Sequence, residues 1–164
     1  NPWRFSFDGG RIAIADVGGG LREEVNFLTR AAAIGANFGW PRYEGSEPLS
    51  DFEPGPGDPP FTFPMLAYDH SGDRCSIIGG YVVRDPELPM LKGRYLYGDF
   101  CTGEVRSFAP DVANQQALRD RPAGVANLDS RTLTSFGQGF NGQIYIAQTS
   151  GAAGSVSRLE PVSP

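Results

Sequence analysis

Three stretches of the chain share one pattern: Gly10-Arg-Ile-Ala-Ile-Ala-Asp-Val17, Gly93-Arg-Tyr-Leu-Tyr-Gly-Asp-Phe100 and Gly142-Gln-Ile-Tyr-Ile-Ala-Gln-Thr149. Each has a turn glycine, a polar residue and then a strand with large apolar side chains at alternate positions. A strand unit that recurs in this way predicts a repeat architecture. Three units are too few to close a ring, so we expect the chain to be part of something larger.

The composition predicts many short strands rather than a few long helices. The 164 residues include 22 Gly and 14 Pro, which form turns. Aromatic residues make up 12% and apolar residues 40% of the chain, enough for a real core. Because helical periodicity is scarce, we predict an all-β fold in a single domain spanning residues 1–164.

The charge argues against a nucleic-acid partner. The net charge is -5, and the sequence contains no run of Lys and Arg. No apolar run approaches the ~20 residues that a membrane helix needs, so we predict no membrane span. The chain begins at Asn1 and shows no signal peptide, as a mature or partial sequence would.

Alternating patterns predict strands in three groups, near residues 3–29, 76–108 and 132–159. Residues 111–121 predict one or two helical turns. Residues 41–64 are rich in Pro, Gly and acidic side chains and predict a long excursion from the core. The individual strands are expected at 3–8, 11–17, 23–29, 75–84, 94–100, 103–108, 132–138, 143–148 and 155–159.

The spacing of the repeat favours a propeller. The second and third copies lie about 50 residues apart, the length of one propeller blade. The first and second lie about 80 apart, which suits one blade carrying the excursion. We therefore predict a partial six-bladed β-propeller of about three blades, near residues 1–45, 65–110 and 125–162, each taking its outermost strand from a linker or a neighbour. Its two open blade faces are expected to pack against a missing amino-terminal half or a second copy.

The two cysteines allow two interpretations. Cys75 opens one predicted strand and Cys101 follows the next, so antiparallel pairing would bring both thiols to the same end of the ladder. A disulfide is then geometrically possible and would indicate an oxidising compartment, hence a periplasmic or secreted protein. The alternative is two reduced cysteines used as small buried apolar residues.

Several segments, read in order, resemble those of one enzyme family. They are Asn1-Pro-Trp-Arg-Phe-Ser-Phe-Asp8, Asp16-Val-Gly18, Glu23-Glu-Val-Asn26, Asn37-Phe-Gly-Trp-Pro41, Tyr68-Asp-His-Ser71, Gly79-Gly-Tyr-Val82, the phrase at residues 93–100, and Ser135-Phe-Gly running into Asn141-Gly-Gln-Ile-Tyr145. Together they resemble the carboxyl-terminal half of the soluble pyrroloquinoline-quinone (PQQ)-dependent glucose/sorbosone dehydrogenases. Those are six-bladed propellers that oxidise aldose sugars, and hedgehog-interacting-protein-like relatives share their fold.

The resemblance implies specific site residues. Asn1 matches an asparagine that contacts the quinone. The loop at Val17, Gly18 and Gly19 is similar to the turn whose backbone carbonyls hold calcium beneath PQQ, although an ordinary glycine turn would look the same. Glu24, with the carbonyl near Phe38, matches the ligands of a structural calcium; a solvated strand-end acid is the alternative.

The sequence also departs from the family. The family's catalytic histidine lies in the amino-terminal half, so no catalytic residue is predicted here. His70, the single histidine, belongs to another motif and fits either a channel mouth or a structural role beside Asp69. Where the glucose enzymes carry cations that grip the quinone, this chain has Cys101, Thr132 and Thr134.

Three functions therefore remain open. The first is a fragment of a PQQ-dependent sugar dehydrogenase that supplies part of the cofactor and calcium floor and is inactive alone. The second is a non-catalytic binding propeller related to the hedgehog-interacting-protein-like branch, which the missing cations favour. The third is an excised half-propeller that assembles with a second copy.

Overall fold

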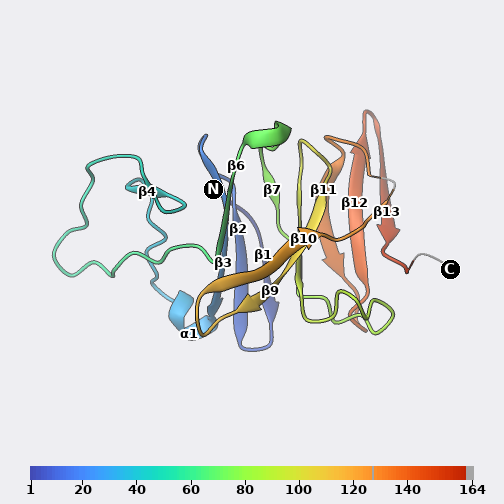
Figure 1. The fold of residues 1–164 in the computed structure, drawn as a ribbon, viewed down its shortest axis with the longest axis horizontal. Coiled ribbons are helices and arrows are strands. Elements are labelled where there is room, and N and C mark those ends of the chain that lie inside the picture. Colours follow the sequence, from blue (N-terminus) through green and yellow to red (C-terminus); the bar gives the residue numbers. More distant parts are fainter. Residues whose placement is uncertain (127, 162–164) are drawn as a thin grey trace.

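The computed structural model describes residues 1–126 and 128–161, so positions 127 and 162 of the predicted third blade lie outside the described residues. The chain forms antiparallel sheets that stand side by side (Figure 1). Only two short helices interrupt the described strands, α1 (Arg30–Ala33) and the 3-10 turn η1 (Ser71–Asp73). The prediction of an all-β, partial β-propeller-like fold is confirmed.

The first sheet has the order β1-β2-β3-β6. Its strands are β1 (Pro2–Asp8), β2 (Arg11–Asp16), β3 (Arg22–Thr29) and β6 (Leu66–Asp69). β1 and β2 form a hairpin, whose turn contains Gly9 with a positive φ of 59°. The fourth strand, β6, comes from the linker after the excursion, whereas the predicted boundary placed it in the second blade.

The second sheet has the order β10-β9-β8-β7. Its strands are β7 (Ile77–Ile78), β8 (Tyr95–Asp99), β9 (Val105–Asp111) and β10 (Gln116–Pro122). β7 is far shorter than the predicted strand 75–84, because Gly79 and Gly80 press against Ala15 and the Leu96 backbone and interrupt the ladder. Pairing resumes with a bridge between Val82 and Tyr95.

The prediction of helical turns at residues 111–121 is wrong. β9 and β10 form a hairpin through this region, with Gln115 in the left-handed conformation at its turn (φ 51°). The register of β10 shifts between Leu118 and Arg121, and Arg119 within this bulge has a φ of 54°. Because the bulge breaks the alternation of apolar and polar residues, the sequence pattern did not indicate a strand here.

Within the described residues the third sheet has three strands, β11 (Leu133–Gln138), β12 (Ile144–Ser150) and β13 (Ala153–Arg158). A two-stranded ribbon, β4 (Tyr43–Glu44) and β5 (Glu47–Pro48), lies in the excursion, which extends away from the sheets (Figure 1). β7 contacts β1 and β2 on one side and β11 on the other, so the three sheets stack in chain order.

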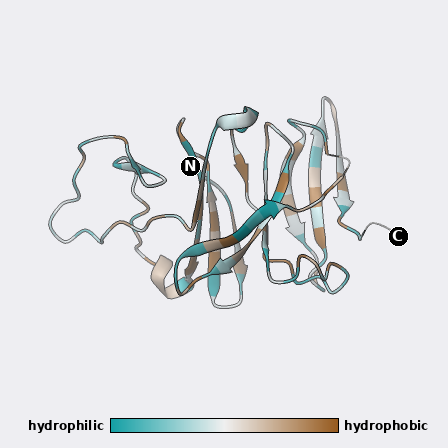
Figure 2. Ribbon diagram, in the orientation of Figure 1, coloured by the Kyte–Doolittle hydropathy of each residue, from teal (hydrophilic) through white to brown (hydrophobic). Residues whose placement is uncertain are grey.

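Two buried clusters fill the spaces between the sheets. One contains Val25 and Phe27 from the first sheet with Tyr95 and Phe108 from the second. The other joins Leu96 of the second sheet to the third sheet, whose Leu133, Ile144 and Ile146 are almost fully buried. Hydrophobic positions concentrate on the strands, while β10 is mostly hydrophilic (Figure 2).

The outer faces of the first and third sheets differ in composition. Trp3, Phe5 and Phe7 alternate along β1 and remain 53%, 62% and 54% exposed. Phe5 and Phe7 pair across the sheet with Ile14 and Ile12. On the third sheet, β13 exposes mainly small and polar residues, with Val156 as its large apolar side chain. Uncovered apolar surface is therefore concentrated on the first sheet.

The predicted disulfide between Cys75 and Cys101 is present, with the two Cα atoms 5.6 Å apart. It joins the segment before β7 to the turn after β8, as antiparallel pairing required. Among the described residues, no helix is long and apolar enough to cross a membrane.

Candidate functional site

A cavity of about 380 Å³ opens where the first sheet meets the base of the excursion. All six residues predicted from the family resemblance line it: Asn1, Val17, Gly18, Gly19, Glu24 and Phe38. Four further residues complete the wall, namely Asp16, Trp40, Tyr43 and Glu44. The structure thus brings the predicted residues together from the N-terminus, the loop after β2, β3 and the segment before β4.

The loop after β2 is shaped by Gly18 and Glu44. The Glu44 carboxylate accepts hydrogen bonds from the backbone N–H groups of Gly20 and Leu21, at 3.0 and 3.1 Å. A Cβ atom on Gly18 would collide with the Arg22 carbonyl and the Glu44 carboxylate. Only glycine therefore allows the loop to lie this close to β3 and β4.

Negative charge accumulates in the cavity. Glu24 is 6% exposed, and its carboxylate accepts a hydrogen bond from Gly45 N–H. Burial raises the pKa of Glu24 from 4.5 to about 7, and the neighbouring carboxylates of Asp16 and Glu44 add to the rise. Burial also opposes ionisation of Glu44, but backbone hydrogen bonds from the loop outweigh it and lower the pKa of that carboxyl.

These donors suit a hard divalent cation. Within residues 1–126 and 128–161, no three His, Cys, Asp or Glu side chains converge as a ready metal cluster. A cation here would need backbone carbonyls as well as carboxylates, a donor set that calcium accepts. The carboxylates of Asp16, Glu24 and Glu44 line the cavity, and a bound cation would favour their ionised forms. The residues present therefore fit calcium.

The three residues that replace the family's quinone-binding cations do not take over that role. Cys101 is in the disulfide. The Thr132 hydroxyl donates to the Asp129 carbonyl at 2.7 Å, and the Thr134 hydroxyl donates to the Ala147 carbonyl at 3.1 Å. None of the three is a cation or lines the cavity.

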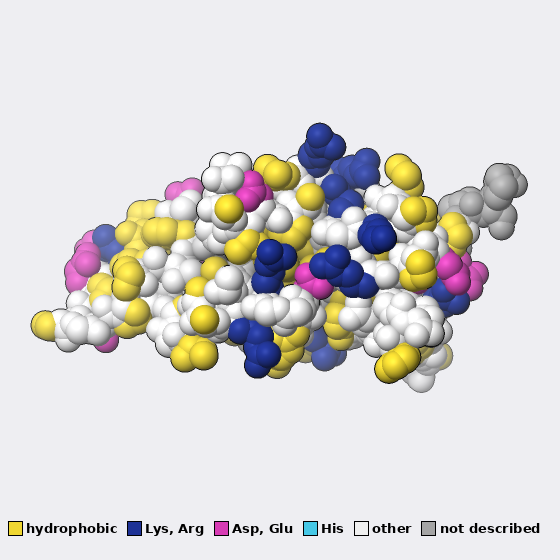
Figure 3. Space-filling view, turned by 90° about the horizontal axis from the view of Figure 1, so that it is seen from below, with side chains coloured by type: hydrophobic (Ala, Val, Ile, Leu, Met, Phe, Trp, Pro, Cys, Tyr) yellow, Lys and Arg dark blue, Asp and Glu magenta, His cyan; other side chains and the backbone are white. Residues whose placement is uncertain are grey.

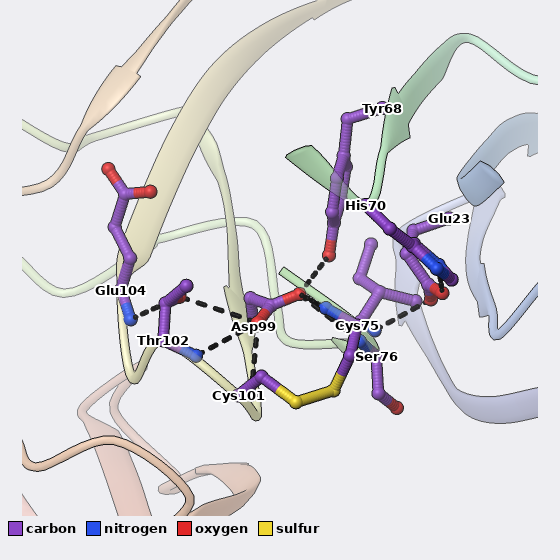
Figure 4. Close-up of a disulfide and its surroundings, with 10 residues drawn as sticks. Glu23, Tyr68, His70, Cys75, Ser76, Asp99, Cys101, Thr102 and Glu104 are labelled. Carbon is purple, nitrogen blue, oxygen red and sulfur yellow. Dashed lines mark hydrogen bonds and ion pairs between the residues drawn. A yellow bond between two sulfur atoms is a disulfide. The ribbon is translucent and has the colours of Figure 1, made fainter. Parts of the chain in front are cut away.

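His70 takes a structural position rather than one in the cavity. Its Nε2 lies 2.8 Å from Glu23 Oε1, and the other oxygen of Glu23 accepts a 2.7 Å hydrogen bond from Ile77 N–H (Figure 4). Glu23 is fully buried, and burial raises its pKa. The partner of His70 is thus Glu23 of β3, whereas Asp69 bonds to Ser71.

A larger cavity, of about 710 Å³, lies beside β10 and β13. It is formed by the loop at 87–91, the segment at 121–126 and the end of β13 with the residues after it. Its walls are mainly apolar, and its charged residues, Glu87, Glu160, Arg121 and Arg158, balance in sign. It contains none of the predicted site residues, so the smaller cavity is the better candidate.

A comparison with solved structures agrees with this architecture, whereas no protein-family model matches the chain. The solved structure of a glucose dehydrogenase superposes with a TM-score of 0.68 at 15% sequence identity, covering 98% of this chain and 44% of that one. The chain therefore shares the fold of part of that structure.

Two plant proteins match the sequence. The HIPL2 protein of Arabidopsis thaliana is 44% identical over 111 residues, covering 60% of this chain and 15% of that protein. The HIPL1 protein of the same plant is 32% identical over 181 residues, covering 92% of this chain and 25% of that protein. The chain therefore spans a quarter or less of the length of these curated relatives.

The prediction from sequence missed Glu44, Tyr43 and Trp40 as members of the cavity. Tyr43 and Glu44 fall in the excursion and Trp40 just before it, a region interpreted as a departure from the core. The sequence signal that could have indicated this part of the cavity was Glu44, an acidic residue between Tyr43 and Gly45 at the start of the excursion.

Proposed function

We propose that this chain forms part of a PQQ-dependent sugar dehydrogenase and supplies the calcium-binding floor of its cofactor site. One observation carries the proposal: the cavity beside β2 gathers Asn1, the loop Val17–Gly19, Glu24 and Phe38. The carboxylates of Asp16, Glu24 and Glu44 in the same cavity support a cation there. The glucose dehydrogenase superposition supports the fold, and the enzymatic activity rests on the resemblance.

In this proposal the chain positions the ion. The resemblance assigns the loop and Glu24 to two different calcium ions, but both line one cavity, so we propose that they share one ion. Glu24 would supply a carboxylate from β3, and the loop that Glu44 fixes would supply backbone carbonyls. When bound, calcium would supply a Lewis acid for the quinone carbonyl, and the quinone would supply the hydride acceptor for aldose oxidation. The base that removes the sugar hydroxyl proton belongs to the missing amino-terminal half. The chain alone is therefore inactive.

The exposed aromatic face of the first sheet supports a missing partner. Trp3, Phe5 and Phe7 form a surface that the amino-terminal half of the parent, or a second copy, would cover. The disulfide supports an oxidising compartment, and we infer a periplasmic or secreted location.

Terbium luminescence tests the cation site directly. Tb³⁺ substitutes for Ca²⁺ and is sensitised by a nearby tryptophan, and Trp40 lines the cavity. We expect Tb³⁺ emission that Ca²⁺ displaces, that Glu24→Gln weakens at least tenfold, and that Glu160→Gln, outside the cavity, leaves unchanged. Absence of Tb³⁺ emission, or emission that Glu24→Gln leaves unchanged, would show that the cavity does not bind calcium as proposed.

A non-catalytic binding propeller is the second candidate. Thr132 and Thr134 favour it, because both side chains are neutral and their hydroxyls donate to backbone carbonyls within the chain, so neither replaces a cation that holds the quinone carboxylates. The HIPL1 and HIPL2 matches support the binding propeller, and the glucose dehydrogenase neighbour supports the sugar dehydrogenase to the same degree. Quinone titration of the longer parent, followed by dye reduction with an aldose, separates the two. Calcium binding without quinone binding would favour the second.

A further inference from the structure

Cations that are scattered along the sequence gather on one edge of this acidic protein. Five are exposed and form no ion pair with any residue in the described part of the chain: Arg11, Arg30, Lys92, Arg119 and Arg121. We call the edge formed by these residues the basic edge. Figure 3 views the molecule from this side, with Lys and Arg clustered centrally and acidic groups mostly at the two ends.

Contacts between turns make the basic edge continuous. Arg30 N–H at the start of α1 donates to the Gly10 carbonyl at 2.9 Å, joining α1 to the β1–β2 turn. Asp8, before that turn, pairs with Arg84 at 2.7 Å. Gly142 of the β11–β12 turn packs against the Arg84 backbone. At the start of β8, Arg94 donates to the Arg119 carbonyl of β10.

Large apolar side chains project from three loops of the same edge. Ile34, directly after α1, is 84% exposed. Met90, in the loop between Arg84 and Lys92, is 76% exposed. Phe140, in the β11–β12 turn, is fully exposed. Figure 1 shows these turns ending together along the lower side of the sheets.

We propose that the basic edge docks on an anionic lipid surface, an interaction that goes beyond the proposed function. Cations near such a surface are attracted to its headgroups, and apolar side chains gain by entering the interface. A soluble polyanion would engage the cations but would leave Ile34, Met90 and Phe140 in water. Because the three side chains come from separate loops of one edge, an extended surface accommodates them together better than a groove does.

Vesicle co-sedimentation of the full chain tests this docking. The probes are vesicles of phosphatidylcholine alone and vesicles of phosphatidylcholine with phosphatidylglycerol, at low salt. We expect binding to the anionic vesicles only, with loss at high salt. Arg11→Gln and Lys92→Gln should each weaken binding about fivefold. The double change Met90→Ser and Phe140→Ser should weaken it at least as much.

Matched controls locate the contact. Arg131→Gln removes an exposed cation near the disulfide, at the opposite end of β8 from the basic edge. Phe52→Ser removes a half-exposed aromatic side chain from the excursion. Both variants should bind the anionic vesicles normally. Phe5→Ser tests the open face of the first sheet and should also bind normally. Loss of binding in Phe5→Ser, equal binding to neutral vesicles, or full binding by the Met90 and Phe140 variant would overturn the proposal. Retention on heparin that these two apolar changes leave intact, without vesicle binding, would indicate a polyanion instead.

Discussion

Tyr68 and Asp99 lie on different sheets, and the Tyr68 hydroxyl donates a 3.0 Å hydrogen bond to Asp99 Oδ2. The same oxygen accepts the backbone N–H groups of Cys75 and Ser76, at 3.1 and 3.2 Å. The other oxygen accepts those of Cys101 and Thr102 (Figure 4). One carboxylate at the end of β8 therefore fixes both sides of the disulfide and the junction with β6.

Replacing Asp99 by Asn should destabilise the protein by more than about 3 kcal/mol, because an amide nitrogen would then face buried N–H groups that lose their acceptor. Tyr68→Phe removes a single bond from the same network and should cost about 1.5 kcal/mol. Urea denaturation measures both free energies of unfolding. Equal losses in the two variants would contradict a central role for Asp99.

Removing the disulfide should lower the free energy of unfolding by about 3 kcal/mol, since the bond restricts the unfolded chain. Urea denaturation of a Cys75→Ser, Cys101→Ser double variant measures the loss, and reduction of the native protein should approach the same value. The reductant should have no effect on the double variant. Unchanged stability after complete reduction would show that the Asp99 network holds this region without the covalent link.

The raised pKa of Glu24 predicts a pH dependence of stability. The folded protein holds the Glu24 proton more tightly than the unfolded chain, whose carboxyl titrates near 4.5, because the folded pKa is about 7. Its contribution to stability is present below about pH 4.5 and is lost as pH rises to about 7. We expect a loss of up to about 3 kcal/mol across this range.

Glu24→Gln should flatten that part of the stability profile, and calcium should stabilise the native protein most above pH 7, where the carboxylate is ionised. Thermal denaturation between pH 4.5 and 8, with and without calcium, measures both effects. A steep profile that persists in the glutamine variant would assign the dependence to another group.

Two neighbouring glycines offer a matched test of the cavity loop. Gly18→Ala should destabilise the protein by about 1–3 kcal/mol and weaken Tb³⁺ binding, because its Cβ has no room beside Arg22 and Glu44. Gly20→Ala meets nothing within 4 Å and should be tolerated. Similar behaviour of the two variants, by denaturation and luminescence, would mean that the loop does not depend on this close approach.

The aromatic face of the first sheet should make the chain self-associate and bind apolar dyes. Changing Phe5 and Phe7 to Thr should reduce both effects and alter stability little, since the rings are more than half exposed. Phe52→Thr, in the excursion, is the control. Light scattering and dye fluorescence report the result; a sharp monomer without dye binding in the unchanged chain would count against an open blade face.

Local pattern and turn chemistry were sufficient to predict most strands and the disulfide. The alternation of Ile12 and Ile14, or of Tyr95 and Tyr97, reflects strands whose two faces meet different surroundings. β10 was missed because its bulge at Arg119 breaks the period of two. The strand beginning near Cys75 was predicted too long because the close backbone packing of Gly79 and Gly80 depends on the neighbouring sheet.

The candidate site was predictable only as far as the resemblance reached. It indicated Glu24 and the loop at Gly18, which the structure brings into one cavity. It could not reveal Glu44, whose role depends on the excursion folding back onto that loop. The basic edge was also invisible, since its cations come from turns far apart in the sequence.

Glu44 reaches the cavity from the first residues of the excursion, while residues 51–58 of that segment are almost entirely exposed. The anchored base and the exposed remainder are under different constraints. Insertions or deletions in the distal part can accumulate during evolution without disturbing either the stacked sheets or the carboxylate that fixes the loop. Variation in the length of this segment among relatives would therefore diversify the rim of the cavity while its floor stays the same.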